Sequence, residues 1–336
     1  MIEEPDLPSV DVVMRTRNRP TMLRRALRDL LKQSHSDWRL VVVNDAGDPS
    51  LVVAAVEAEL PQDERVQILH REKSSGMEAA SNAGIRVGSA PLVVVHDDDD
   101  TWHPEFLERT AASLQAHQHW VAVATRTEIV HEVIDGDEIT ETGRQTYAPD
   151  IQDVTLTELL VSNVAVPISL VYRRSAHADI GWFDESLPVV GDWDFNLRLA
   201  VRGEIGFLDG EPLAFWHQRA ASEGVAGNSI IARRREHERF SMLVRDRALR
   251  QEAGSEALGS LHHITRLVEL RVTELKSWNQ TLADMIEYQH HQLDRQDTQI
   301  RELQTALEHV VERLNLVAKI KGILGAAGRR LRGRKV

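Results

Sequence analysis

The feature that most limits the fold is the alternation of short β-branched runs with helical patterns over the first 110 residues. Strand-like runs lie at 10–14, 40–44, 66–70 and 92–96, and helix-like segments lie between them at 21–33, 51–60 and 76–87. Apolar strands separated by helices of this length are typical of βαβ units and a parallel sheet covered on both faces. The sequence therefore predicts an α/β fold with a mostly parallel central sheet.

Polar side chains are concentrated where the predicted strands end. Residues 15–20 follow the first strand, 44–47 the second and 97–100 the fourth. Ligands of open parallel sheets bind outside the carboxyl ends of the strands. We therefore expect these segments to meet in one crevice.

Composition excludes several classes of protein. The chain has no Cys, which excludes disulfides and Cys-ligated zinc, so that a metal would need oxygen or imidazole ligands. A net charge of −12 argues against a nucleic-acid partner. No apolar run approaches the roughly 18–20 residues of a membrane helix, and the acidic N-terminus is unlike a secretory signal. We therefore expect a cytoplasmic protein.

Four consecutive aspartates, Asp97 to Asp100, follow the apolar run at 92–95. Adjacent carboxylates repel, so this run at the end of a buried strand costs stability unless a cation or polar ligand compensates. Charge runs are more often solvated faces, but this one leads from a core strand directly into the segment TWHP. The run predicts a site for Mg²⁺ or Mn²⁺, which prefer oxygen ligands.

The motifs over roughly residues 8–230 resemble those of family 2 glycosyltransferases, which have the GT-A fold. In the segment VVVHDDDDTWHPEFLE, Asp97 and Asp99 match the family's aspartate-any-aspartate element. The resemblance implies a nucleotide-sugar-binding domain in which Asp99 and Asp97 ligate Mg or Mn. It also implies that Asp97 or Asp98 contacts the ribose or a metal-bound water.

The opening segment, with its turn TRNRP, resembles the family's nucleobase-binding region. The resemblance implies that Thr16, Arg17 and Asn18 bind the nucleotide. Asp45 would accept the imide hydrogen of uracil or thymine, which favours UDP- or dTDP-sugars without excluding GDP. Arg17 stands where the family often has Tyr, so a guanidinium plane would stack on the base.

A third match lies in SSGMEAASNAGIRVGSAP, where Gly76 and Asn82 fit the family's nucleotide-contacting stretch. Ser81 replaces its usual Arg. For Gly84, helix packing is the better interpretation.

The catalytic candidate is Asp192, in a segment that resembles the family's acceptor side. An inverting transfer needs one carboxylate to take the proton of the acceptor hydroxyl, and the resemblance assigns that role to Asp192. Gly191 stands where the family often has Glu. Asp194 is the competing base, and a purely structural alternative is that Asp192 caps a helix.

His217 follows the apolar stretch LAFW, as a His near the diphosphate and metal does in many family members. The resemblance implies a third metal ligand. A structural histidine is an equally good interpretation.

Beyond about residue 232 the chain becomes helical almost to its end. Apolar residues at heptad spacing run from Leu261 to Met285 and resume out of phase from Leu293 to Val317, which predicts a coiled-coil oligomerisation arm with a stutter. A helical hairpin packed on the catalytic domain is the alternative.

Residues 319–336 contain seven Lys and Arg and no acid, which suits an anionic membrane surface or a solubilising tail.

The predicted domains are a GT-A glycosyltransferase domain at 1–235, a helical linker at 236–260, a coiled-coil oligomerisation arm at 261–318 and a basic tail at 319–336. The predicted function is inverting transfer of a sugar from a nucleotide-diphosphate sugar to a hydroxyl acceptor. That acceptor would be a cell-envelope or polysaccharide glycan, or a lipid-linked one at the inner face of the membrane. The alternatives are an inactive transferase-like head on a coiled-coil scaffold and a sugar-1-phosphate nucleotidyltransferase.

Overall fold

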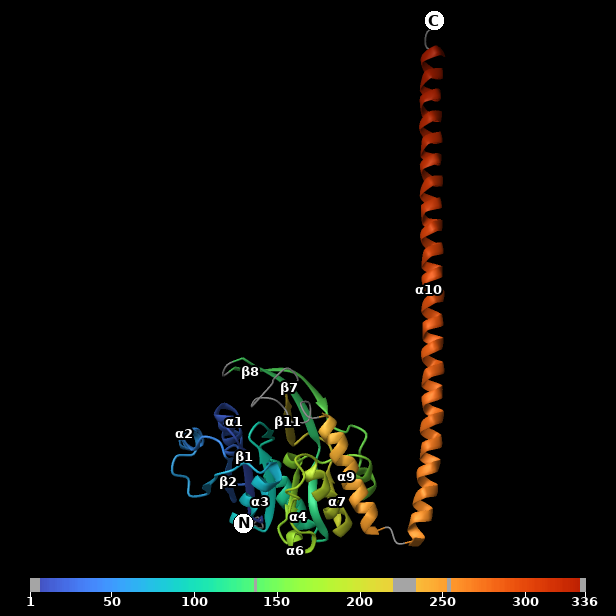
Figure 1. Ribbon diagram of the computed structural model, residues 1–336. Helices are drawn as coiled ribbons and strands as arrows, with labels where there is room; N and C mark the ends of the chain where they lie inside the picture. Colours follow the sequence, from blue (N-terminus) through green and yellow to red (C-terminus); the bar gives the residue numbers. More distant parts are fainter. Residues whose placement is uncertain (1–6, 136–137, 220–233, 253–254, 333–336) are drawn as a thin grey trace. The chain divides into compact units, whose positions relative to one another are not determined.

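The structure is a computed structural model that describes residues 7–135, 138–219, 234–252 and 255–332 (Figure 1). The chain divides into two compact units, Met1–Leu249 and Arg250–Val336, which we call the head and the arm. The division lies beyond the boundary expected near residue 235. Residues 136–137 and 220–233 are among those outside the described ranges.

The head is built on a seven-stranded sheet in the order β10-β6-β9-β4-β1-β2-β3. Its strands are β1 (Val10–Thr16), β2 (Trp38–Asp45), β3 (Val66–Arg71), β4 (Leu92–Asp97), β6 (Trp120–Thr125), β9 (Leu170–Arg173) and β10 (Glu204–Leu208). Neighbouring strands are parallel except for β9, which runs antiparallel to β4 and β6. The predicted α/β class with a mostly parallel sheet is confirmed, and β1 lies between β2 and β4 as the convergence of their ends requires.

Helices cover both faces of this sheet (Figure 1). Because successive side chains of a strand point to opposite faces, Val12 packs in one core cluster and Val13 in the other. The first cluster contains residues of α1 (Pro20–Leu30), α2 (Pro49–Glu59) and α4 (Phe106–Ala116). The second contains residues of α3 (Met77–Val87), α5 (Leu156–Val161), α6 (Ala176–Ile180) and α7 (Gly191–Arg202).

A second, four-stranded sheet has the order β5-β11-β7-β8. Its strands are β5 (Thr101–Trp102), β7 (Thr127–Asp135), β8 (Glu138–Thr146) and β11 (Ala214–Gln218). β7 and β8 form an antiparallel pair. β11 pairs with β5 directly after the acidic run, so this sheet brings residues from beyond 210 back to the end of β4.

Helix α9 (Arg234–Glu252), which the sequence predicted to be mostly linker, packs on the head. Val244 is buried in the second core cluster and Phe240 packs against it. The guanidinium of Arg245 lies 4.5 Å from the centre of the Trp193 ring and donates to the Val161 carbonyl at 2.9 Å. The head therefore extends further along the chain than expected because α9 buries an apolar face against α5 and α7.

The arm consists of the helix α10 (Ser255–Arg332), roughly 115 Å long at 1.5 Å per residue. Predicted seam residues such as Leu275, Leu282, Ile300 and Leu307 are all more than half exposed. The seam positions Leu261, Leu314 and Val317 are outside the residues whose side chains are described. No helix in the described ranges is long and apolar enough to cross a bilayer.

Candidate active site

A cavity of about 440 Å³ opens at the carboxyl ends of β1 and β4. Its wall also includes the first turns of α3 and α7, the segment 161–167 and one face of α9. Its charged, hydroxyl and amide side chains belong to Arg15, Arg19, Glu78, Asp97, Asp99, Asp100, Tyr147, Ser162, Asn163, Asp192, His237, Glu238, Ser241 and Arg245. The acidic run and the predicted base therefore face the same cavity.

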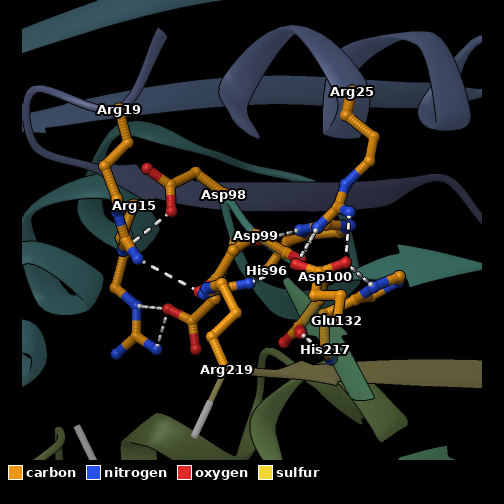
Figure 2. A network of polar contacts seen from close by, with 11 residues as sticks. Arg15, Arg19, Arg25, His96, Asp98, Asp99, Asp100, Glu132, His217 and Arg219 are labelled. Carbon is orange, nitrogen blue, oxygen red and sulfur yellow. Dashed lines mark hydrogen bonds and ion pairs between the residues drawn. The ribbon is translucent and has the colours of Figure 1, made fainter. Parts of the chain in front are cut away.

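Arginines, rather than solvent, balance the charge of the acidic run (Figure 2). Arg15, at the end of β1, donates from Nε to Asp97 Oδ1 at 3.0 Å. Arg19, just before α1, lies 2.8 Å from Asp98 Oδ1. The register of the parallel pair β1 and β4 places Arg15 opposite Asp97, so the strand pairing itself brings these charges together.

Asp99 is at the centre of a second, deeper layer of ion pairs. Its Oδ2 lies 3.1 Å from Arg19 and also accepts from Arg219, whose side chain is fully buried. Arg219 bridges to Glu132 on β7 at 2.5 Å. Glu132 also accepts from Arg25 of α1 at 2.7 Å. Buried pairs of this kind are stable only while each charge keeps its partner.

The pKa of each of these carboxyls depends on how far its cationic and hydrogen-bonding partners offset its burial. Burial raises the pKa of Asp98 to about 7, because Arg19 offsets only part of the desolvation and Asp99 repels its charge. Burial opposes the ionisation of Asp99 too, but Arg19 and Arg219 outweigh it and lower the pKa. The pKa of Glu132 falls to about 2, since hydrogen bonds from His217 and Arg25 overcome its desolvation. Asp99 and Glu132 are therefore anionic at neutral pH.

His217 takes part in this deeper layer and does not line the cavity. Its Nδ1 lies 2.8 Å from Glu132 Oε2, and its Nε2 lies 2.8 Å from the hydroxyl of Thr101. Its backbone N–H donates to Asp100 at 2.9 Å. Burial lowers its pKa, so the ring is neutral near pH 7. Both ring nitrogens are thus engaged, which matches the structural interpretation of this residue.

A divalent cation would be held by Asp97 and Asp99, which are the predicted ligands that line the cavity. Carboxylate oxygens are the donors that Mg²⁺ and Mn²⁺ prefer. His217 does not fit in this arrangement, because binding through either nitrogen would break a hydrogen bond to Glu132 or Thr101. Within the described ranges, no three His, Asp or Glu residues converge to hold a metal.

Asp192 lies in the first turn of α7 and lines the same cavity as Asp99. Its Oδ2 accepts from Asn163 Nδ2 at 2.7 Å, and Asn163 is held in turn by Asn196 of α7 at 3.2 Å. Burial raises the pKa of Asp192, against the opposing effects of the Trp193 backbone N–H and of Arg15. The residue before α7 is Val190, so Asp192 is not the helix cap.

The residues predicted to bind the nucleobase do not line the cavity. Arg17 and Asn18 are exposed in the turn after β1, and Thr16 is buried at the end of that strand. The Asn18 side chain accepts from the Asp48 backbone N–H at 2.7 Å. Asp45 ends β2 and accepts from Ser74 at 2.6 Å, besides forming an ion pair with an arginine of β3.

Gly76 and Asn82 have different roles in the fold. Gly76 has a φ of 101° at the start of α3, a conformation that favours glycine. Asn82 is fully buried, and its side chain binds both the carbonyl and the N–H of Phe183, at 2.9 and 3.0 Å. It therefore fastens α3 to the turn before α7. Gly84 packs against β1, where a Cβ would lie 2.4 Å from a Val13 methyl, as the packing interpretation expects.

Sequence patterns did not identify three residues that line the cavity, Arg15, Glu78 and Asn163, or two of the deeper layer of ion pairs, Glu132 and Arg219. Only Arg15 carried a recognisable signal, because it is a charged residue near the end of a strand that is buried throughout. The contacts of Glu132 and Arg219 join positions 87 residues apart, and periodicity carries no information about such pairs.

The comparisons with known proteins agree with this architecture. The sequence profile of glycosyl transferase family 2 matches residues 11–181, about half of the chain. The uncharacterized glycosyltransferase YwdF of Bacillus subtilis is 32% identical over 57% of this chain and 68% of its own length. A PGL/p-HBAD biosynthesis glycosyltransferase of Mycobacterium bovis is 25% identical over 57% of this chain and 69% of its own.

A solved structure of TarS residues 1–349 from S. aureus, in complex with UDP-GlcNAc, is similar with a TM-score of 0.51 and 20% identity. The match covers 66% of this chain and 61% of that one. At this identity the likeness concerns the fold. Together with the profile match, it agrees with the GT-A type of domain expected from the motifs. The chain belongs to glycosyl transferase family 2, and it is a glycosyltransferase.

Proposed function

We propose that this protein is an inverting glycosyltransferase that moves a sugar from a nucleotide-diphosphate sugar to a hydroxyl of a glycan. The observation that carries the proposal is that Asp192 lines the same cavity as Asp97 and Asp99. A transfer with inversion needs a base on one side of the sugar and charge neutralisation at the leaving diphosphate on the other. The cavity supplies both.

Asp192 would take the proton from the acceptor hydroxyl during attack on the sugar. Its raised pKa favours this step, because a base works best when its pKa lies closer to the working pH. The amide of Asn163 holds one carboxylate oxygen of Asp192 at 2.7 Å. Asp194, the competing base, forms a 2.7 Å ion pair with Arg198 and does not line the cavity.

Asp97 and Asp99 would hold Mg or Mn, and the bound cation would neutralise the developing charge of the diphosphate. Arg19 lines the cavity beside Asp99 and would contribute positive charge at the same place. For the nucleotide we favour UDP or dTDP, because Asp45 ends β2 with a carboxylate that suits an imide. The complex of the structurally similar TarS with UDP-GlcNAc supports this preference.

We propose that the acceptor is a cell-envelope or polysaccharide glycan, either free or lipid-linked. It is supported by the PGL/p-HBAD biosynthesis role in the name of the mycobacterial relative. The cavity volume of about 440 Å³ is in the range of pockets that bind small ligands.

The test of activity is hydrolysis and transfer by the full chain, with UDP- and dTDP-sugars and with or without Mn²⁺. We expect Asp192→Asn to lower turnover by about 10²- to 10⁴-fold, the usual contribution of a general base. Asp194→Asn is the matched control on the same helical turn and should retain most activity. Equal turnover by wild type and Asp192→Asn would exclude Asp192 as base. No turnover with any donor by wild type would favour an inactive head.

Donor identity is best approached by thermal shift with Mn²⁺ present, because a ligand that binds only the folded state raises its stability. We expect a uridine or thymidine diphosphate sugar to raise Tm, and Asp45→Ala to reduce that shift. A larger shift with a GDP-sugar would contradict the assignment of the base.

We further propose that α10 self-associates as a coiled coil. Its seam residues are exposed in the described part of the arm, and an apolar stripe of this length is stable in water when a second helix covers it. The full chain should be an oligomer by native mass, and deletion of residues 258–336 should give a monomer that keeps the head folded. A full-length monomer would contradict the proposal.

The basic tail at 319–336 would bind anionic lipid headgroups and place the enzyme at the inner face of the membrane. The full chain should co-sediment with phosphatidylserine vesicles at low salt, and deletion of 319–336 should abolish this. Oligomerisation would strengthen each weak contact through avidity. Absence of binding by the full chain would refute this role.

A further inference from the structure

Glu78 is a buried carboxyl in the cavity wall that the roles assigned so far do not use. It lies in the first turn of α3 and is about 4% exposed. Its Oε2 has no hydrogen-bond partner among the described residues. A buried carboxylate is costly unless it is paired or has a function, and its nearest compensating charge is the guanidinium of Arg15.

The space that Glu78 occupies is made by a glycine of the opposite helix. A Cβ on Gly191, the first residue of α7, would lie 2.3 Å from both Cγ and Oε1 of Glu78. Any side chain at position 191 would therefore displace this carboxylate. Gly191 directly precedes Asp192, so Glu78 rests on the turn of backbone that carries the proposed base.

The charges around the two carboxyls are arranged as one group. Burial raises the pKa of both Glu78 and Asp192, Arg15 opposes both shifts, and the two carboxyls repel each other. Each lies in the first turn of a helix, where the dipole favours negative charge. Arg15 also donates to Ser81 of α3 at 3.2 Å, which ties this cation to the helix that carries Glu78.

We propose that Glu78 is a positioning residue for Asp192. Its side chain extends from α3 into the space left by Gly191 and thereby fixes the position and the charge of the base. This inference rests on the proposed function. It assigns to α3 a part of the acceptor side of the site, and it explains why position 191 has no side chain. The carboxylate is supplied from 113 positions earlier in the chain, as the numbering of the two residues shows.

The decisive experiment relocates the carboxylate in the full-length protein. Glu78→Gln and Glu78→Ala should each lower kcat by roughly 10- to 100-fold, the usual cost of misplacing a reacting group, while KM for the donor changes little. Gly191→Glu alone should also lower kcat, because its side chain and Glu78 compete for one space. The double variant Glu78→Ala with Gly191→Glu should recover a large part of the lost kcat.

A matched control shows whether the effect depends on the position of the carboxylate or on the loss of any negative charge. Glu158→Gln removes a carboxylate from the first turn of α5, where the side chain is exposed, and should leave kcat unchanged. Wild-type kcat in Glu78→Gln, or a folded double variant no better than Glu78→Ala, would overturn the proposal. If the alanine variant does not fold, the isosteric Glu78→Gln decides alone.

Failure of this inference can be told apart from failure of the proposed function. Loss of turnover in Asp192→Asn with full turnover in Glu78→Gln would refute only the role of Glu78. Turnover insensitive to both would refute the base itself. The competition for space can also be measured without an activity assay. Gly191→Ala should lower Tm in the wild-type background and should not lower Tm in the Glu78→Ala background. Additive effects would show that the two residues do not compete for space.

Discussion

At the end of β4, the carboxylates Asp97, Asp98 and Asp99 each lie against an arginine, whereas Asp192, in the first turn of α7, is held by an amide and a backbone N–H. We call these the β4 side and the α7 side. On the β4 side, arginines lower the pKa of Asp99 despite its burial. On the α7 side, burial dominates and raises the pKa of Asp192.

The difference fits the two chemical tasks that we propose for these carboxylates. A group that binds a cation or diphosphate must remain charged throughout the reaction, and nearby guanidinium groups ensure this. A base must instead accept a proton, and a weakly compensated, desolvated carboxylate does so more readily. The contrast between Asp99 and Asp192 therefore follows from how closely guanidinium groups approach each carboxyl, and it can be tested one side at a time.

The largest effect on stability is expected on the β4 side. Asp99→Asn removes a carboxylate that binds the fully buried Arg219, which also binds Glu132. Breaking a buried ion pair costs about 3–5 kcal/mol, and we expect the lower end because repulsion of Asp98 is relieved. Urea unfolding measures the loss. Asp179→Asn, which breaks a half-exposed pair with Arg202, should cost under about 1 kcal/mol. Equal losses of unfolding free energy in the two variants would show that the buried ion pairs do not stabilise the β4 side.

The next effect is a pH dependence on the α7 side. Burial raises the pKa of Glu78 from its ordinary 4.5 to about 7, with Arg15 opposing the shift and Asp192 adding to it. The folded state therefore binds this proton more tightly than the unfolded state. Its contribution to stability is complete below pH 4.5 and is lost as pH rises through 7, by up to about 3 kcal/mol.

Glu78→Gln isolates that contribution. The stability of wild type relative to Glu78→Gln should fall between pH 5 and pH 8, as measured by chemical unfolding at each pH. Glu158→Gln should show no such trend, since its carboxyl is exposed. A pH-independent difference for Glu78→Gln would mean that Glu78 titrates like a solvated carboxyl and that the α7 side is not desolvated.

A third prediction concerns the connection between α3 and the turn before α7. Asn82→Ala removes the hydrogen bonds to Phe183 and Glu185. Leaving buried backbone groups unpaired should cost about 1–3 kcal/mol of unfolding free energy. Because this turn leads to Asp192, kcat should fall while donor affinity, measured by calorimetry, stays unchanged. A weakened donor affinity at constant kcat would instead support the nucleotide contact that the sequence motif predicted.

The sequence predicted the fold more completely than the site. Alternating apolar runs were enough to place β1, β2 and β4 in one parallel sheet, because each run is buried on both faces. They also placed Asp97 and Asp45 at strand ends. These inferences depend only on local periodicity and on the general geometry of parallel sheets.

The partners of those residues were not predictable in the same way. Arg219 reaches Asp99 across 120 positions because β11 pairs with β5 in the second sheet. His217 was expected at the metal, but the same pairing directs its ring to Glu132 and Thr101. Glu78 and Gly191 meet only because two helix starts converge on one cavity. Such contacts depend on tertiary placement, and a periodic pattern does not specify them.

The smallest effect is expected where α9 closes the α7 side. Arg245 stacks 4.5 Å above the ring of Trp193 and binds the Val161 carbonyl from an exposed position. A cation–π contact at such a site contributes about 0.5–1 kcal/mol, so Arg245→Ala should reduce the unfolding free energy by about that amount. Arg245→Lys, which keeps the charge but not the planar group, should recover part of it. Since Arg245 lines the cavity beyond Asp192, we expect KM for the acceptor to rise in Arg245→Ala while donor affinity stays constant. A changed donor affinity would mean that α9 also reaches the β4 side and that the two sides are less separate than their charges indicate.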